Sequence, residues 1–161
     1  MKVSVRHVSR ADASALCDVI NPIIEKGGTT AHEDPHDAAY FEAKIGALGP
    51  RDFFHVAEAG GRVVGMQYVQ SHPDIDPDTG DIASFVALDA AGVGVGKALA
   101  EATFAEAKRR GWTSLFAYIR GDNEGGLAYY ESIGFRTVKV DEKRPLKDGT
   151  LVDRIAKLKS L

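Results

Sequence analysis

The hydrophobic residues of this chain alternate between the two-residue period of strands and the longer period of amphipathic helices. Residues 2–7 alternate polar and β-branched side chains, which is typical of a strand with one buried face. Apolar residues then recur at helical spacing over residues 11–24, which predicts a first helix, ended by two glycines. Asp34 followed by Pro35 has the form of a helix N-cap, so we expect a second helix over residues 35–48.

The rest of the chain shows the same two patterns in turn. We expect the following elements: strands at residues 53–58, 63–70 and 81–88, a helix at 96–110, a strand at 115–120, a short helix at 127–132, and strands at 136–143 and 150–158. This order indicates an α/β protein with a mixed sheet and helices packed against it. A length of 161 residues, without repeats or a low-complexity linker, predicts one domain over residues 1–161.

Composition and charge narrow the function. A formal net charge of -3 leaves no excess of basic residues to neutralise phosphates, so we do not expect a nucleic-acid partner. Cys17 is the only cysteine and can form no internal disulfide. The chain has neither the apolar centre of a signal peptide near Met1 nor an apolar run long enough to span a membrane. We therefore expect a cytoplasmic protein without a membrane partner.

Two sequence patterns resemble metal sites, and neither is complete. His32 and His36 have the H-E-x-x-H spacing of a zinc protease, but Pro35 between them would break the helix that such a site requires. Asp74 opens a loop of alternating aspartates that resembles an EF-hand, yet Thr79 takes the place of the required glycine. We therefore expect no metal ion.

A glycine-rich run at residues 92–97, here called the glycine stretch, lies between a predicted strand and a predicted helix. Ala91 and Ala98 replace the first glycine and the hydroxyl residue of a Walker A loop, and Lys97 or Leu99 replaces the third glycine of a Rossmann motif. The helix start still offers unpaired N–H groups at the positive end of the helix dipole. The glycine stretch therefore favours an anion site, or else it serves only close packing of the strand and the helix.

Residues 122–135 resemble a segment of the GNAT N-acetyltransferases, with Asn123 after a strand, a helix that carries Tyr130, and then Gly134-Phe135. The resemblance covers nearly the whole order of elements. It implies a twisted, mostly antiparallel sheet of about seven strands, split between the fourth and the fifth, with about four helices packed on its two faces.

The glycine stretch resembles the pyrophosphate motif of the same family. Gly94 and Gly96 fill its two glycine positions, whereas Ala91 stands where the family usually has Arg or Gln. Lys97 is either a cation that replaces this missing side chain or a solvated lysine. The resemblance implies that acetyl-CoA is bound by the following residues: Val86, Leu88, Val93, Gly94, Val95, Gly96, Lys97, Ala98 and Asn123.

The resemblance also implies direct transfer of an acetyl group from acetyl-CoA to a primary amine, which leaves two protons to move. The spacing of Tyr130 resembles that of the family's general acid, and Tyr129 is the neighbouring alternative. A phenol titrates at about 10 and a thiol at about 8.5, close enough for a tyrosine to protonate the departing thiolate. The position of Asp81 resembles that of a catalytic Glu in the phosphinothricin-acetyltransferase-like branch. Asp81 is then a general base that acts through a water molecule, or else an exposed carboxylate at the end of a strand. Glu33 and His72 are further candidates for the base.

The family builds its acceptor site from the first two helices and nearby loops, which here implies Thr30, His32, Glu33 and Tyr68 as substrate-binding residues. We expect a small-molecule amine, while peptide N-termini, polyamines and aminoglycosides stay open. The family also allows a homodimer, which the sequence by itself does not show. Two other functions remain as alternatives: a non-catalytic acyl-CoA-binding or sensor domain of the same fold, and an interaction protein whose glycines serve only packing.

Overall fold

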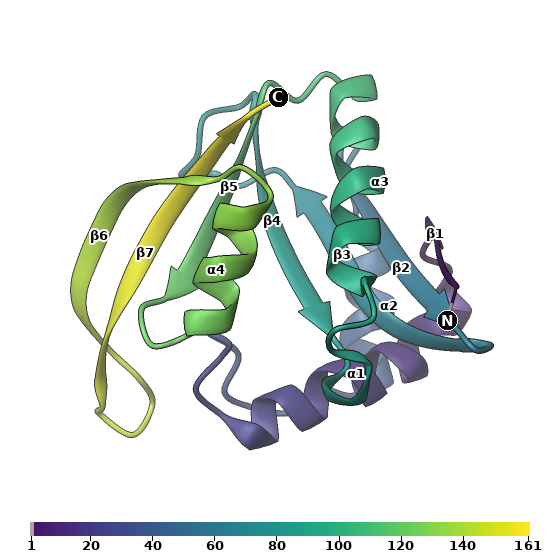
Figure 1. The fold of residues 1–161 in the computed structure, drawn as a ribbon, viewed down its shortest axis with the longest axis horizontal. Coiled ribbons are helices and arrows are strands. Elements are labelled where there is room, and N and C mark those ends of the chain that lie inside the picture. The colour runs from purple at the N-terminus through teal and green to yellow at the C-terminus, as the bar shows by residue number, and fades with distance from the viewer. Residues whose placement is uncertain (1) are drawn as a thin grey trace.

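The computed structural model describes residues 2–161 (Figure 1). Its strands and helices are β1 (Val3–His7), α1 (Ala13–Lys26), α2 (Ala38–Gly46), β2 (Phe53–Ala59), β3 (Arg62–Gln70), β4 (Thr79–Val86), α3 (Val95–Arg109), β5 (Ser114–Arg120), α4 (Glu124–Ser132), β6 (Arg136–Pro145) and β7 (Leu151–Ser160). The strands form one seven-stranded sheet in the order β1-β2-β3-β4-β5-β7-β6. The predicted mixed α/β sheet is confirmed.

The sheet is split between β4 and β5. These two strands are parallel and pair only over residues 79–81 of β4 and 114–116 of β5, whereas the other neighbouring strands of the described chain are antiparallel. Beyond this short pairing β4 and β5 diverge, and the N-termini of α3 and α4 lie at the open end (Figure 1). The predicted split between the fourth and fifth strands is therefore confirmed, and it brings two helix starts to one opening.

Helices cover both faces of the sheet, with α3 and α4 in front and α1 and α2 behind in the view of Figure 1. The side chains of β4 alternate accordingly, since Ser84 contacts α4 while Phe85 joins the core that contains α1. Gly65 of β3 lets α3 approach closely, because a Cβ atom there would lie 2.8 Å from the buried Val95 side chain. The first turn of α3 is thereby fixed over the sheet beside the split.

The second helix begins later than the Asp34-Pro35 pattern predicts. Asp37 is its N-cap, since its side chain accepts a hydrogen bond from the Tyr40 amide at 3.0 Å. Asp34 instead pairs with Lys147 on the β6–β7 turn, with 2.9 Å between the charged atoms. Asn21 of α1 also holds the backbone of His36 through two hydrogen bonds. The predicted helix start was wrong because these long-range contacts keep residues 28–36 out of a helix.

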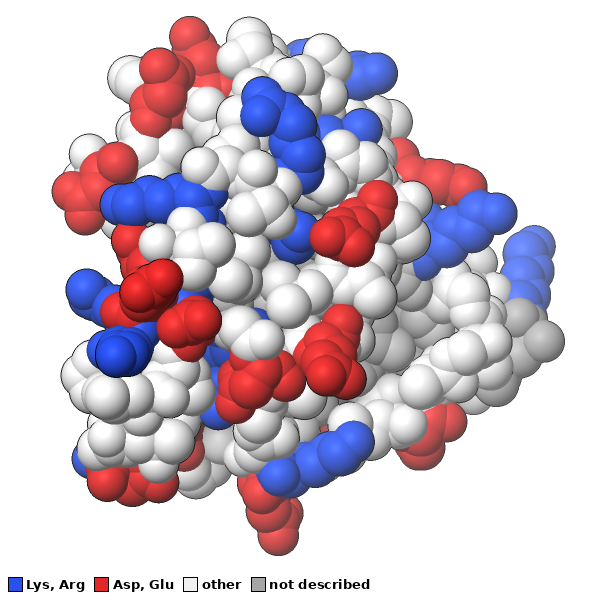
Figure 2. All heavy atoms as spheres, turned by 60° about the vertical axis from the view of Figure 1, so that its left-hand side comes forward, with Lys and Arg blue, Asp and Glu red and all other residues white. Residues whose placement is uncertain are grey.

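The outer face around β6 and β7 carries basic and acidic side chains in close alternation (Figure 2). Lys139 pairs with Asp141 at 3.1 Å, and such exposed ion pairs contribute little to stability because water screens the two charges. The hairpin is therefore held mainly by the pairing of β7 with β5. None of the helices described over residues 2–161 has the length and apolar character needed to cross a membrane.

Candidate active site

A cleft of about 480 Å³ opens where β4 and β5 diverge, between the end of β4 and the starts of α3 and α4. Its lining residues are Ile23, Thr29, Ser84, Phe85, Val86, Leu88, Ala90, Ala91, Gly92, Gly94, Val95, Gly96, Asn123, Gly125, Gly126 and Tyr129. Six of the residues predicted to bind the cofactor are among them: Val86, Leu88, Gly94, Val95, Gly96 and Asn123. Val93 and Lys97 lie on the same loop and first helical turn, with their side chains exposed. Leu88 lies in a short 3-10 turn, Leu88–Ala90, and not on β4 as predicted.

The backbone of the glycine stretch takes conformations that few residues other than glycine adopt. Gly92 and Gly94 have φ angles of +82° and +87°, and Gly94 is the N-cap of α3. A helix leaves its first amides without internal partners, so Val95, Gly96 and Lys97 present N–H groups at the positive end of the α3 dipole. The amide of Ala98 already donates to the Gly94 carbonyl at 3.1 Å. Ala98 is therefore removed from the predicted set of backbone donors.

Asn123 caps α4 and also fixes the loop after α1. Its side-chain oxygen accepts a hydrogen bond from the Gly126 amide at 2.9 Å, and its side-chain nitrogen donates to the Thr29 carbonyl at 2.6 Å. This side chain lines the cleft, but both of its polar ends are bound by the protein. Asn123 thus acts through position, since it joins two walls of the opening.

A smaller cavity of about 160 Å³ continues from the cleft between β4 and β5 and contains Tyr130. The Tyr130 hydroxyl is 2.8 Å from the Ser84 hydroxyl, and its side chain is buried. Burial raises the pKa of Tyr130 above the ordinary value of a phenol, while the hydrogen bond with Ser84 acts to lower it. A buried phenol at the wall of this cavity is suited to hold a proton and release it at one place.

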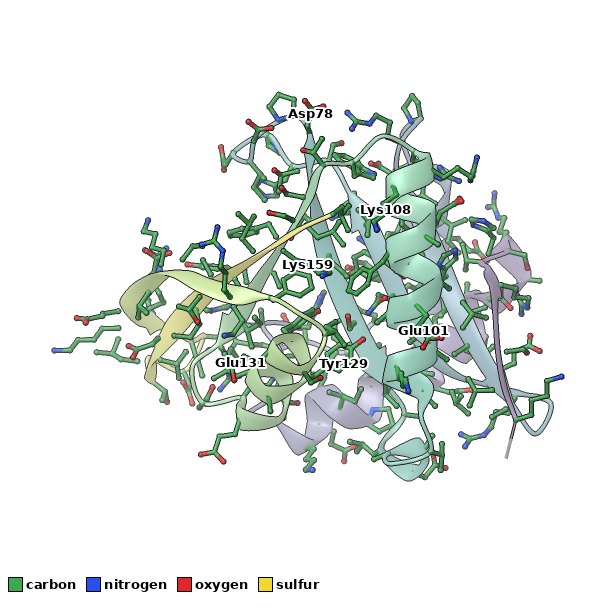
Figure 3. The ribbon with its side chains drawn as sticks, turned by 45° about the horizontal axis from the view of Figure 1, so that its top comes forward. Asp78, Glu101, Lys108, Tyr129, Glu131 and Lys159 are labelled. Carbon is green, nitrogen blue, oxygen red and sulfur yellow. The ribbon has the colours of Figure 1, made fainter. Side chains whose placement is uncertain are left out.

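Tyr129 lies on the side of α4 that faces α3 (Figure 3). Its hydroxyl donates to the Gly96 carbonyl at 2.8 Å and accepts a hydrogen bond from the Gln67 side chain at 3.0 Å. A Cβ atom on Gly96 would come within 2.9 Å of the Tyr129 ring, so this glycine also serves close packing. The hydroxyl of Tyr129 is therefore fully engaged by the protein.

Gln67 is a buried residue that contacts two residues of the site and that the sequence patterns missed. Its side chain is fully buried in β3, and its nitrogen donates to the Ser84 hydroxyl at 2.7 Å and to the Tyr129 hydroxyl. Its oxygen has no hydrogen-bond partner among the described residues, and a buried unpaired acceptor costs about 1–3 kcal/mol. The available signal was a polar residue in the middle of an apolar strand.

A third cavity, of about 580 Å³, is lined by His72, Asp74, Ile75, Asp81, Phe116, Tyr118, Val138, Lys139, Asp141 and Ala156. Tyr118 lines both this cavity and the one that contains Tyr130. Asp81 lies at the last position of β4 that pairs with β5, opposite Phe116. Burial raises the pKa of the Asp81 carboxyl, an effect that nearby His72 and Lys44 partly oppose.

Two of the four predicted acceptor residues, Thr30 and His32, line the cavity that contains Tyr130. The Nδ1 atom of His32 lies 2.9 Å from the Nε2 atom of His36, which is a hydrogen-bond distance. Burial lowers the pKa of His32 to about 4. Glu33 instead accepts a hydrogen bond from the Lys147 amide at 2.9 Å, on the β6–β7 turn.

Tyr68 lies buried beneath the Lys44 ammonium group, which is 4.1 Å from the ring centre. Glu33 and Tyr68 are absent from the linings of the three cavities described above, because tertiary contacts hold both side chains elsewhere. Within residues 2–161, no three His, Cys, Asp or Glu side chains are grouped as ligands for a metal ion.

Comparison with known proteins shows which families share these features. The model of the acetyltransferase (GNAT) family matches residues 18–135. A mycothiol acetyltransferase from Saccharomonospora viridis is 36% identical over 96 residues, which cover 55% of this chain and 31% of that protein. A second one, from Pseudarthrobacter chlorophenolicus, is 32% identical over 104 residues, covering 62% and 32%. The chain thus spans about a third of the length of these curated relatives.

Two solved structures match nearly the whole chain. A ribosomal-protein-alanine N-acetyltransferase from Brucella melitensis has a TM-score of 0.90 and 25% identity, over 98% of this chain and 99% of that one. A phosphinothricin acetyltransferase from Sinorhizobium meliloti, in complex with acetyl-CoA, has a TM-score of 0.90 at 20% identity, over 100% and 89%. The second likeness concerns the fold alone.

Proposed function

This chain belongs to the GNAT family of acetyltransferases, and from that premise we propose that it transfers an acetyl group from acetyl-CoA to a primary amine of a small molecule. Tyr130 is the proposed general acid. The observation that carries the proposal is the opening between β4 and β5, where an α-helix begins at Gly94 and the Tyr130 hydroxyl lies in the adjoining cavity.

The residues at the opening fit acetyl-CoA. The first amides of α3, from Val95 to Lys97, would hold the pyrophosphate, since no Cβ at Gly94 or Gly96 blocks its approach. The β5 side of β4 is unpaired beyond Asp81, so its backbone can pair with an extended pantetheine arm. When bound, acetyl-CoA supplies an activated thioester. Ala91 provides no side-chain cation at this site, which leaves the charge of the pyrophosphate to the backbone amides and Lys97.

The proposed chemistry forms one C–N bond and breaks one C–S bond. The amine would attack the acetyl carbon in its neutral form, and as the C–N bond forms Asp81 would accept the excess proton of the nitrogen through a water molecule. Tyr130 would donate its proton to the departing sulfur. The raised pKa of Asp81 suits a base, because a more basic carboxylate holds the transferred proton more strongly.

The acceptor is proposed to reach the reaction site from the cavity lined by Asp81, Asp141 and Tyr118. The carboxylates of Asp74 and Asp81 at its wall favour a cationic amine, whereas the charge of Asp141 is already paired with Lys139. The aromatic ring of Tyr118 adds a flat apolar surface. The name of the mycothiol acetyltransferases supports a small acceptor. The name of the Brucella structure supports a second candidate acceptor, a peptide with alanine at its N-terminus.

Release of free CoA thiol from acetyl-CoA tests this function directly. We expect turnover with at least one member of a panel that contains small diamines, amino-sugar amines and alanine-terminated peptides. Thermal stability is measured beside it, because acetyl-CoA at about 100 times its Kd stabilises a binding protein by about 2.7 kcal/mol. Stabilisation without turnover across the panel would favour a non-catalytic acyl-CoA sensor, and neither effect would favour a packing role for the glycines.

Replacing Gly94 by Ala should weaken acetyl-CoA binding by distorting the start of α3. The φ angle of +87° penalises a side chain by about 1–2 kcal/mol, although a Cβ atom there would meet nothing within 4 Å. We expect a several-fold rise in the KM for acetyl-CoA and a lower melting temperature.

Gly61→Ala in the β2–β3 turn is the matched control, since Gly61 has a φ angle of +74° and equally open space. It should lower the melting temperature similarly and leave the KM unchanged. Equal KM values for the two variants would remove the glycine stretch from the cofactor site.

A further inference from the structure

The buried side chain of Gln67 lies at the centre of a hydrogen-bond chain that reaches Tyr130. Its nitrogen donates to the hydroxyls of Ser84 and Tyr129, at 2.7 and 3.0 Å. Its oxygen has no hydrogen-bond partner within residues 2–161. An apolar side chain of the same size would fill this space without an unpaired polar atom. The presence of a buried amide here therefore requires an explanation.

The Tyr129 end of this hydrogen-bond chain determines which group is the donor in each bond. The Tyr129 hydroxyl donates its single proton to the Gly96 carbonyl at 2.8 Å. Its oxygen can therefore only accept a hydrogen bond from Gln67. The amide nitrogen of Gln67 must therefore face Tyr129, and its second N–H meets the Ser84 hydroxyl. The unpaired oxygen is the consequence of this orientation, because turning the amide over would place two acceptors against each other.

The orientation of Gln67 in turn makes Ser84 the donor in its hydrogen bond with Tyr130. Because the Ser84 oxygen accepts from Gln67, its own proton is available to donate to the Tyr130 oxygen, which is 2.8 Å away. A phenol that gives up its proton leaves a negative oxygen, and that oxygen needs a donor in this buried place. Hydrogen bonds in such a chain polarise one another, so a donor at Ser84 strengthens the bond to Tyr130.

We propose that Gln67 is a positioning residue that orients the Ser84 hydroxyl as a donor to Tyr130 and so stabilises the phenolate formed when Tyr130 protonates the departing sulfur. The inference rests on the proposed acid role of Tyr130. It also links the acid to the cofactor loop, since the chain of hydrogen bonds begins at Gly96 in the first turn of α3.

Gln67→Met tests the proposal, since methionine is unbranched, of similar volume and without a strong donor. We expect it to lower kcat about tenfold with the KM for the amine unchanged. In a Tyr130→Phe background, which cannot form a phenolate, the same substitution should change kcat less than about twofold. Ser84→Ala should behave in the same way in both backgrounds, because it removes the next link of the chain.

Thr103→Val is the control, because Thr103 is a fully buried polar residue of α3 outside this chain of bonds. It should leave kcat unchanged and calibrate the effect of a buried substitution on the melting temperature. Equal loss of kcat from Gln67→Met in both backgrounds, or no loss in the wild type, would overturn the role of Gln67 alone. If Gln67→Met does not fold, Gln67→Leu, which also lacks the donor, is judged by the same criteria. An unchanged kcat for Tyr130→Phe itself would remove the proposed acid, and this inference with it.

Discussion

Replacing Tyr130 by Phe is expected to lower kcat about 100-fold, with less than about a twofold change in the KM for acetyl-CoA. The ring would still fill its buried site against Phe135, whose centroid lies 5.0 Å from that of Tyr130. The variant therefore removes the proton and the bond to Ser84 while it preserves packing. Steady-state kinetics with saturating amine measure the effect, and the melting temperature verifies that the fold is intact.

Tyr129→Phe distinguishes the two neighbouring tyrosines. Its hydroxyl is bound to Gly96 and Gln67, so we expect a higher KM for acetyl-CoA and a much smaller loss of kcat than in Tyr130→Phe. The reverse result, an unchanged kcat in Tyr130→Phe and a large loss in Tyr129→Phe, would assign the acid role to Tyr129.

Asp81→Asn should abolish most of the activity at neutral pH, with a loss in kcat/KM for the amine of about 100-fold. A general base acts as the carboxylate, so the wild-type rate should fall as the pH drops through the pKa of Asp81. Because burial raises that pKa, the fall should begin at a higher pH than for an exposed aspartate. The variant should lose this acidic limb and keep only the dependence on the neutral form of the amine.

Asp74→Asn provides the matched control, since Asp74 lines the same cavity and the substitution changes the charge by the same amount. It should leave the acidic limb in place. An unaltered limb in Asp81→Asn would clear Asp81 of the role. The same loss of the limb in both variants would indicate a general electrostatic effect on a cationic amine.

The order of strands and helices, and the place of the split, could be predicted from the sequence. Periodicity and capping residues act over a few positions, so β2, β3 and α3 begin and end within about two residues of their predicted bounds. The two motifs, the glycine stretch and residues 122–135, are also local. Through the resemblance to the GNAT family they implied a cofactor cleft between the fourth and fifth strands, and Gly94 and Gly96 line the cleft that lies there.

The tertiary structure decided what each polar side chain contacts. Gln67 meets Tyr129 across 62 positions of the chain, Ser84 meets Tyr130 across 46, and Asn123 meets Thr29 across 94. Local sequence patterns cannot predict such pairs, because the pairs depend on how the sheet brings distant strands and helices together. Other contacts between distant residues, of Glu33 with Lys147 and of Tyr68 with Lys44, hold these two side chains away from the cavities. The sequence by itself thus determined the order of the elements and the cofactor motif, while long-range packing determined where the second helix begins and which polar side chains lie together at the opening.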